Sequence, residues 1–152
     1  MKIRKASLKD LEEIKKLNQE LFYHDLNFDN TLDVKWPDKN KNYYKKRITN
    51  KDSLALVVES EKKIIGYLFG AITDAQNYRT IKKIAELENM LILQEHRGKG
   101  IGKRLIKEFI GWAKSKKRKR IKVIASAQNQ QAIAVYKNSG FSECAMILEA
   151  SI

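Results

Sequence analysis

The chain has 152 residues, of which 43% are hydrophobic and 32% are charged. This length and composition suit one folded domain over residues 1–152 and exclude a disordered chain. No apolar run approaches the roughly 20 residues that a membrane-spanning helix needs, and the N-terminus lacks the apolar core of a secretory signal. Cys144 is the only cysteine, which excludes an internal disulfide, so we expect a cytoplasmic protein without a membrane partner.

The net charge of +13 is concentrated in one part of the chain. Residues 97–122 hold 12 lysines and arginines against one acid, Glu108, and they include the basic run Lys116–Arg120. Such a pattern is typical of a site for a polyanion, either a phosphorylated cofactor or a nucleic acid. The alternative, above all for Lys116–Arg120, is a lysine-rich surface that contacts only solvent.

Alternating and helical patterns of apolar residues predict the elements of the first half of the chain. Ser7 and Asp10 have the spacing of a capping box with Asp in place of Glu, which marks the start of the first helix. Residues 23–40 break the pattern and predict either a long loop or a short helix with loops, and long loops often line a binding site. The predicted elements are a strand at 2–6, a helix at 8–22, a short helix at 42–49 and two hairpin strands at 54–59 and 64–73.

The second half of the chain alternates strands with helices. Its clearest helix begins at the glycines, because Ile101, Leu105, Phe109 and Trp112 recur three or four residues apart. The order of the elements predicts a single α/β domain with a mixed sheet. The predicted elements are a long strand at 82–93, helices at 100–115 and 129–138, a strand at 120–127 and a closing strand at 141–149.

Three glycines, Gly98, Gly100 and Gly102, lie between the strand at 82–93 and the helix that follows it. A P-loop counted from Gly98 would need its second glycine at position 103, which is lysine. The dinucleotide-binding fingerprint fails at the same position, since its third glycine would also fall on Lys103. The glycines still expose successive N–H groups at a helix N-terminus, which is an arrangement that binds phosphate.

Two motifs together resemble the GNAT N-acetyltransferase superfamily. The first is Arg97-Gly-Lys-Gly-Ile-Gly102, which fits the signature Arg/Gln-x-x-Gly-x-Gly between a strand and a helix. The second begins with Asn129 at the start of a helix, continues to Tyr136 seven residues on and ends with Gly140-Phe141. One strand separates the two motifs, as in that family, and the resemblance is specific over about residues 84–141.

The resemblance implies a single-domain GNAT-like fold, in which a mixed, mostly antiparallel sheet with splayed central strands is flanked by helices. It also implies that the glycine loop holds the pyrophosphate of acetyl-CoA, the acetyl donor, while pantetheine lies beside the end of the preceding strand. Asn129 matches the family's amide side chain that contacts the pantetheine arm. The residues implied to bind the cofactor are Met90, Leu91, Ile92, Arg97, Gly98, Lys99, Gly100, Ile101, Gly102, Lys103, Asn129 and Tyr136.

Acetyl transfer to an amine needs a base for the ammonium and an acid for the leaving thiolate. By the resemblance Tyr136 is the acid, although composition alone favours a helix tyrosine packed against Val135 and Phe141. Glu88 first, and Glu86 second, are candidates for the base, because two acids on one face of an apolar strand are costly unless that face meets water or a cation. Such a base could act directly or through water, and the alternative role of the two acids is ion pairing with lysines.

The two histidines give weaker signals. Neither His24 nor His96 has a second histidine or a cysteine at ligand spacing, so we expect no metal site. His24 lies among several acids in residues 23–40, the segment that forms the acceptor wall in similar proteins. These acids would suit a cationic amine, and their alternative role is that of solvated loop residues.

The sequence therefore predicts an N-acetyltransferase that transfers acetyl from acetyl-CoA to a primary amine by direct transfer in a ternary complex. The acceptor stays open among small amines or polyamines, protein amines and an amino sugar, and a homodimer stays open because similar proteins are often dimers. Two alternatives are a basic nucleic-acid-binding module and a GNAT-like protein that binds CoA without catalysis. Nucleic-acid binding explains the charge but not the glycine spacing. The basic region also lacks interleaved aromatics for base stacking, because Phe109 and Trp112 lie at apparent core positions, so we expect no nucleic-acid partner.

Overall fold

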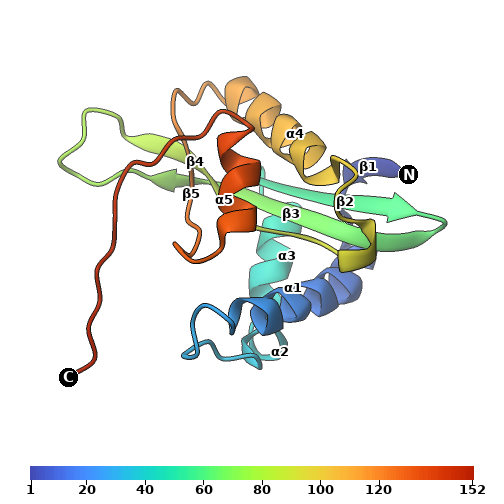
Figure 1. The fold of residues 1–152 in the computed structure, drawn as a ribbon. Helices are drawn as coiled ribbons and strands as arrows, with labels where there is room; N and C mark the ends of the chain where they lie inside the picture. Colours follow the sequence, from blue (N-terminus) through green and yellow to red (C-terminus); the bar gives the residue numbers. More distant parts are fainter.

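The computed structural model describes all residues 1–152 and has a five-stranded sheet with helices on both faces (Figure 1). The strands lie across the sheet in chain order. The first four pair antiparallel, whereas the last two pair parallel, so the sheet is mixed and mostly antiparallel, as predicted. The strands are β1 (Lys2–Lys5), β2 (Ser53–Ser60), β3 (Lys63–Asp74), β4 (Lys83–Ile92) and β5 (Ile121–Val123).

The sheet splays open between β4 and β5. Only Ala85–Leu87 of β4 pairs with β5, and the rest of β4 as far as Ile92 pairs with β3 alone. The register between β3 and β4 shifts once: Gly70 lies opposite Leu87 and Phe69 lies opposite Asn89, so Glu88 is the extra residue of a β-bulge. A bulge bends its strand, which is consistent with β4 leaving β5 at this point.

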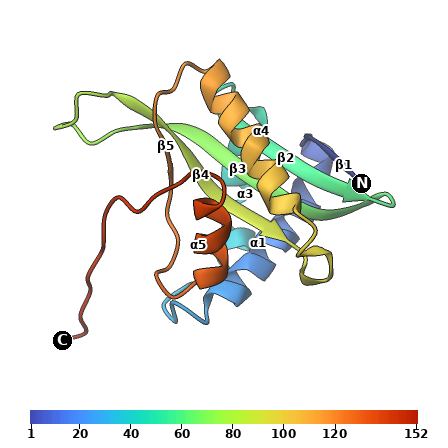
Figure 2. The same ribbon diagram turned by 45° about the horizontal axis from the view of Figure 1, so that its top comes forward.

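Two layers of helices enclose the sheet (Figure 2). The helix α4 packs on one face with α5 beside it, and α1 and α3 pack on the other face. None of the helices combines the length and the apolarity needed to cross a membrane. The helices are η1 (Leu8–Asp10), α1 (Leu11–Asp25), α2 (Trp36–Lys39), α3 (Lys41–Thr49), η2 (Gln94–His96), α4 (Ile101–Ser115) and α5 (Gln130–Lys137).

Each face of the sheet has its own hydrophobic core. Under α4 the fully buried Leu105 and Phe109 pack against the sheet. Gly70 on β3 permits this approach, because a Cβ atom there would lie 2.8 Å from the Phe109 ring. On the opposite face Ile14 of α1 and Tyr44 of α3 are equally buried. Burial of a large apolar side chain contributes about 2 kcal/mol, so these two cores hold the helices against the sheet.

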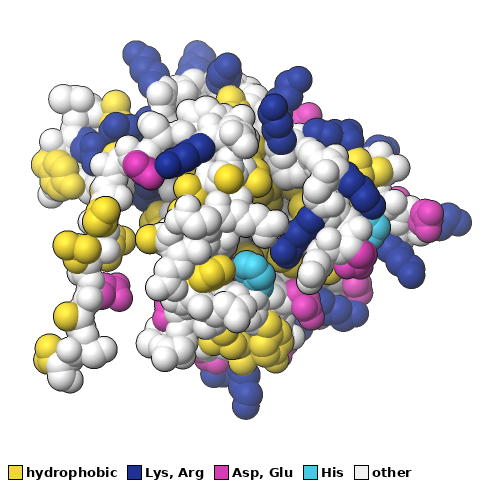
Figure 3. Space-filling view, viewed as in Figure 1, with side chains coloured by type: hydrophobic (Ala, Val, Ile, Leu, Met, Phe, Trp, Pro, Cys, Tyr) yellow, Lys and Arg dark blue, Asp and Glu magenta, His cyan; other side chains and the backbone are white.

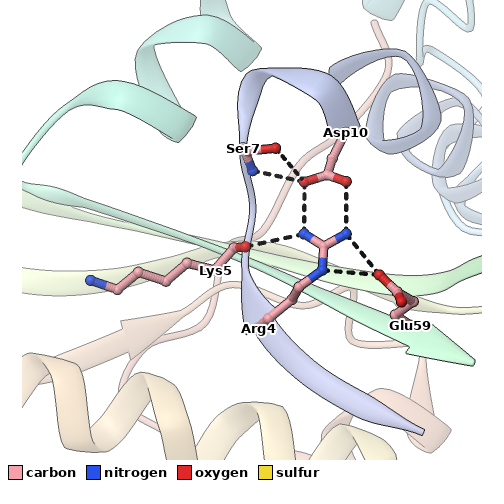
Figure 4. A network of polar contacts seen from close by, with 5 residues as sticks. All are labelled: Arg4, Lys5, Ser7, Asp10 and Glu59. Atoms are coloured by element: carbon pink, nitrogen blue, oxygen red, sulfur yellow. Dashed lines mark hydrogen bonds and ion pairs between the residues drawn. The ribbon is translucent and has the colours of Figure 1, made fainter. Parts of the chain in front are cut away.

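Arg4 joins β1 to the start of α1 and to β2 (Figure 4). Its guanidinium donates two parallel hydrogen bonds to Asp10, at 2.8 and 2.9 Å, and further bonds to Glu59. Asp10 also accepts the backbone N–H of Ser7 at 2.7 Å, as the predicted capping box requires. The Arg4 guanidinium holds the pKa of Asp10 at about 2, below its usual value of 3.8, despite the opposing effect of burial.

Three predictions of secondary structure need correction. The first helix continues to Asp25 instead of ending at residue 22, and residues 23–40 contain the short helix α2, which was one of the two alternatives for this segment. The strand predicted at 120–127 shortens to β5, because β4 diverges and leaves residues 124–127 without a partner. The closing strand predicted at 141–149 is wrong: after Phe141 the chain makes no backbone hydrogen bond, so its strand pattern is left without a partner strand.

Candidate active site

A cavity of about 340 Å³ opens where β4 separates from β5. Its walls are the end of β4, the loop and first turn that lead into α4, one side of α5 and the end of α1. Figure 3 shows this face hollowed beside α5, with hydrophobic side chains inside and basic side chains at the rim. Lys99 is the only predicted cofactor residue outside the lining. The lining includes Met90, Leu91, Ile92, Arg97, Gly98, Gly100, Ile101, Gly102, Lys103, Asn129 and Tyr136.

The loop depends on two glycines for its backbone conformation. Gly98 has φ +74° and Gly100 has φ +73°, which is the left-handed region that side chains with a Cβ atom rarely adopt. An added Cβ atom would meet nothing within 4 Å at either position, so the glycines serve conformation and not packing. Gly102 differs, because a Cβ atom there would contact Met90 and Val135 across the cavity at 3.7 and 3.8 Å.

The loop presents a continuous run of free backbone donors. The first hydrogen bond of α4 runs from Arg104 N to Gly100 O at 3.1 Å, and the N–H groups from Gly98 to Lys103 have no backbone acceptor. These donors coincide with the positive end of a 15-residue helix. The run therefore fits an anion such as a pyrophosphate, with Lys103 and Arg104 exposed beside it.

Arg97 connects the glycine loop to β4 through a hydrogen bond. Its Nε donates to the carbonyl of Ile92, the last residue of β4, at 2.8 Å. The loop therefore returns toward the sheet directly after β4, and η2 makes up the turn between them. The signature arginine thus positions the free donors relative to the splayed strand.

The other wall of the cavity is one side of α5. Asn129 caps this helix, since its Oδ1 accepts the N–H of Ala132 at 3.1 Å. That contact occupies the oxygen and leaves the Nδ2 group available to the cavity. The sequence interpretation missed Ala132 and Val135, which line the same wall. Their spacing of three residues from Asn129 onward could have identified them, because residues three apart share a helix face.

Tyr136 lies on the cavity wall one residue after Val135. Its ring packs edge-on against Phe141 with centroids 5.7 Å apart, so the packing role considered for this residue is present as well. Burial raises the pKa of Tyr136 to about 12, and the negative charge of Asp25 adds to this effect. The phenol is therefore protonated at neutral pH and can donate a proton.

The two acids of β4 lie outside the lining of the cavity, and each has a cation. Glu88 binds Arg47 through both carboxylate oxygens, with Nη2 to Oε1 at 2.6 Å, and it accepts the Tyr43 hydroxyl at 2.8 Å. Glu86 pairs with Lys122 of β5 at 3.1 Å. The alternative role of the two acids, ion pairing, is thus present, with a lysine as the partner of Glu86 and an arginine as the partner of Glu88.

Arg47 and Tyr43 are partners of Glu88 that the sequence did not reveal. Both belong to α3, and their pairing with Glu88 spans 41 and 45 residues of sequence. The Glu88 carboxylate raises the pKa of Arg47, and burial followed by Glu88 raises the pKa of Tyr43. No local pattern could predict this cluster, because it depends on how α3 packs against the bulge of β4.

The end of α1 brings polar groups to the cavity. His24 lines it, and its Nδ1 lies 3.0 Å from the Asp25 carboxylate. His96 also lines the cavity, from η2. The segment after Tyr23 therefore does border the site, but its contribution comes from the last turn of a helix and not from a loop.

The glycine loop, the splayed strand and α5 together define a class of protein. Residues 11–141 match the family described as "Acetyltransferase (GNAT) family", so the chain belongs to this family. An uncharacterized N-acetyltransferase of Archaeoglobus fulgidus is 25% identical over 138 residues, which are 90% of this chain and 89% of the relative. A second relative is MJ1207 of Methanocaldococcus jannaschii, which is also named an uncharacterized N-acetyltransferase. It is 34% identical over 62 residues, which are 41% of this chain and only 27% of that relative.

Solved structures share the whole fold. A mutant of the BH1408 protein of Bacillus halodurans has a TM-score of 0.88 at 21% identity, covering 100% of this chain and 99% of that one. A predicted acetyltransferase of Clostridium acetobutylicum, solved with acetyl-CoA, has a TM-score of 0.78 at 22% identity, covering 99% and 95% of the two chains. An aminoglycoside 6'-N-acetyltransferase of Acinetobacter haemolyticus also reaches 0.78 at 22% identity, covering 100% and 98%.

Proposed function

We propose that this chain transfers the acetyl group of acetyl-CoA to a primary amine by direct transfer in a ternary complex. The observation that carries the proposal is the run of free N–H groups from Gly98 to Lys103 at the cavity. A pyrophosphate suits this run, because the backbone donors and the positive end of α4 act on the same anion. The splayed edge of β4 offers main-chain groups to the amides of pantetheine, in the manner of an added strand.

The reaction moves protons at the amine nitrogen and at the leaving sulfur. The ammonium first gives up a proton to Glu88 or, as the second candidate, to Glu86. The amine nitrogen forms a bond to the thioester carbonyl carbon, and the carbon–sulfur bond then breaks. We assign the proton that the leaving sulfur takes up to the Tyr136 hydroxyl, which lines the cavity in its protonated form. The nitrogen loses its second proton as the amide forms, and that proton restores the Tyr136 hydroxyl. The cavity lining contains neither cysteine nor serine, which supports direct transfer.

Glu88 is preferred as the base because it is the extra residue of the β4 bulge, and bulges often redirect a side chain beside an active site. Its contacts with Arg47 and Tyr43 stabilise the carboxylate and reduce its tendency to take a proton. The role therefore requires either a water relay or an acceptor ammonium that displaces Arg47. The second route would couple deprotonation to binding of the amine.

The acidic side chains near the cavity are the basis for the proposed class of acceptor. Asp25 acts electrostatically on Tyr136 at the cavity, and Glu88 lies on the same strand as Met90. The Asp25 carboxylate favours an amine that arrives as a cation, and Glu88 adds to this effect where the ammonium displaces Arg47. We therefore propose a small amine, a polyamine or a protein amine as the acceptor. Some structures of the same fold are aminoglycoside acetyltransferases, but their identity to this chain supports only the fold.

The test is an amine screen that measures thiol release from acetyl-CoA. Tyr136→Phe should lower the rate constant kcat by about 10²–10⁴-fold and leave acetyl-CoA binding intact. Tyr78→Phe is the matched control, because Tyr78 is 78% exposed in a loop outside the cavity. Glu88→Gln should slow the reaction more than Glu86→Gln. Binding of acetyl-CoA without amine-dependent release would instead support a protein that binds CoA without catalysis.

A further inference from the structure

His24 lines the cavity but takes no part in the proton transfers of the proposed reaction. It belongs to the last turn of α1, and its ring packs edge-on against Phe28 with centroids 5.5 Å apart. Its Nδ1 atom lies 3.0 Å from a carboxylate oxygen of Asp25, and no protein group bonds to its Nε2 atom. Two contacts therefore hold the ring, while its second nitrogen stays free at the cavity.

The contact with Asp25 sets the protonation of the ring. A carboxylate beside Nδ1 accepts the proton of that nitrogen, so the neutral ring carries its hydrogen on Nδ1 and keeps a lone pair on Nε2. Positive charge that appears on the ring lies beside the carboxylate and at the negative end of a 15-residue helix. His24 is therefore able to accept a proton at Nε2 and to pass it on.

The His24–Asp25 pair lies at the end of the cavity that holds Tyr136. Burial raises the pKa of Tyr136, and the charge of Asp25 raises it further, so the carboxylate acts on that phenol. The other ionisable side chains of the lining come from η2, the glycine loop and the first turn of α4, where the phosphates would bind. They are His96, Arg97 and Lys103. His24 is therefore the proton acceptor of the lining that lies beside the phenol.

The proposed reaction leaves one proton transfer without a group of its own. Once the carbon–nitrogen bond has formed, the nitrogen is positively charged and still holds the second proton that it must lose. Direct return of this proton to Tyr136 requires the phenol to reach both the sulfur and the nitrogen. Glu88 and Glu86 lie outside the cavity lining, and each is paired with a cation. A separate acceptor in the cavity removes the double demand on the phenol.

We propose that His24 is a catalytic residue that carries this second proton, and that Asp25 is its positioning residue. The inference rests on the proposed acetyl transfer and adds one step to it. Nε2 takes the proton from the positively charged nitrogen, whose N–H bond breaks and leaves its electron pair on the nitrogen. The imidazolium then gives the proton to the Tyr136 phenolate, which has passed its own proton to the sulfur. Neutral His24 and protonated Tyr136 are thereby restored for the next turnover.

Chemical rescue tests this step, with kcat measured as amine-dependent thiol release from acetyl-CoA. His24→Ala should lower kcat by about 10²-fold and bind acetyl-CoA as the wild type does, because general base catalysis contributes on this scale. Added imidazole should raise the rate of His24→Ala by about 10-fold, since it supplies the missing proton acceptor. Imidazole should not raise the rate of the wild type or of Tyr136→Phe. Glu20→Ala is the matched control, because Glu20 is exposed on the same helix outside the cavity lining and should keep the wild-type kcat.

The positioning role of Asp25 is tested in a double variant. Asp25→Asn should lower kcat by less than His24→Ala does, and the double variant should be no slower than His24→Ala, because two residues that act as one unit do not lose their effect twice. Wild-type kcat in His24→Ala, a slow His24→Ala that binds acetyl-CoA but gains nothing from imidazole, or additive losses in the double variant would each overturn the proposal. A wild type without amine-dependent thiol release would instead contradict the acetyl transfer itself, and this step with it.

Discussion

The left-handed conformation of Gly100 makes a prediction that can be worked out from the structure. Gly100→Ala adds a Cβ atom that meets nothing within 4 Å, so the substitution causes no clash and its cost comes from the backbone alone. The left-handed conformation costs an alanine about 1–2 kcal/mol. Part of this cost is offset because the unfolded chain also loses freedom, by about 0.4–1 kcal/mol. We therefore expect the free energy of unfolding to fall by about 1 kcal/mol.

Gly111→Ala is the matched control within the same helix. Gly111 lies inside α4, has no unusual backbone angle and also has open space where a Cβ atom would go. Alanine there should raise the free energy of unfolding by about 1 kcal/mol, because alanine favours a helix interior over glycine by about that amount. Urea unfolding should thus separate the two variants by about 2 kcal/mol, although both carry the same chemical change.

Binding of acetyl-CoA should separate the same pair of variants. If the loop of Gly100→Ala relaxes out of the left-handed region, the run of N–H donors loses its alignment and affinity falls. A loss of about 1 kcal/mol corresponds to roughly a 5-fold weaker Kd. Equilibrium dialysis with labelled acetyl-CoA measures this change, and Gly111→Ala should bind as the wild type does. Equal stability and equal affinity for the two variants would refute the role assigned to the loop.

Three further predictions concern charge. The free energy of unfolding should fall by about 2 kcal/mol as pH drops from about 5 to about 2. Folding lowers the pKa of Asp10 from 3.8 to about 2, so the ionised carboxylate stabilises the fold at pH values above 3.8, and this contribution is lost as the carboxylate takes a proton. Asp10→Asn should flatten the pH dependence of urea unfolding. Arg47→Leu should lower the free energy of unfolding by about 2 kcal/mol, as measured by urea unfolding, because Glu88 keeps a largely buried charge without its cation. Adding Glu88→Gln to this variant should restore part of the lost stability. Charge reversal of Lys116–Arg120 should lower acetyl-transfer activity little, whereas a protein that acts by binding nucleic acid would lose its function in the same variant.

Local patterns predicted most of the fold and most of the cavity. The helix at Ile101–Ser115 has buried residues at regular spacing, and the glycines before it fail two other phosphate motifs at Lys103. These features depend on neighbouring residues only. Asn129 and Tyr136 were identified through the family resemblance of the second motif, and the structure places both on the cavity.

Features that depend on distant partners could not be predicted. The bulge that makes Glu88 the extra residue of β4 is set by register with β3, and its arginine comes from α3. Nothing near Glu88 in sequence indicates Arg47 as its cation. The segment after Phe141 has a strand pattern but no strand partner within the chain. A strand pattern predicts that a segment can form a strand, whereas its pairing depends on which edge of a sheet is available.

Calorimetric titration of the purified protein with acetyl-CoA tests the central claim most directly. We predict saturable binding at one site per chain, which Gly100→Glu abolishes because its carboxylate places negative charge and bulk where the pyrophosphate would lie. The fold of that variant is checked by its urea unfolding. Binding of equal strength by Gly100→Glu, or no binding by a folded wild type, would contradict the assignment of the loop to the pyrophosphate of acetyl-CoA.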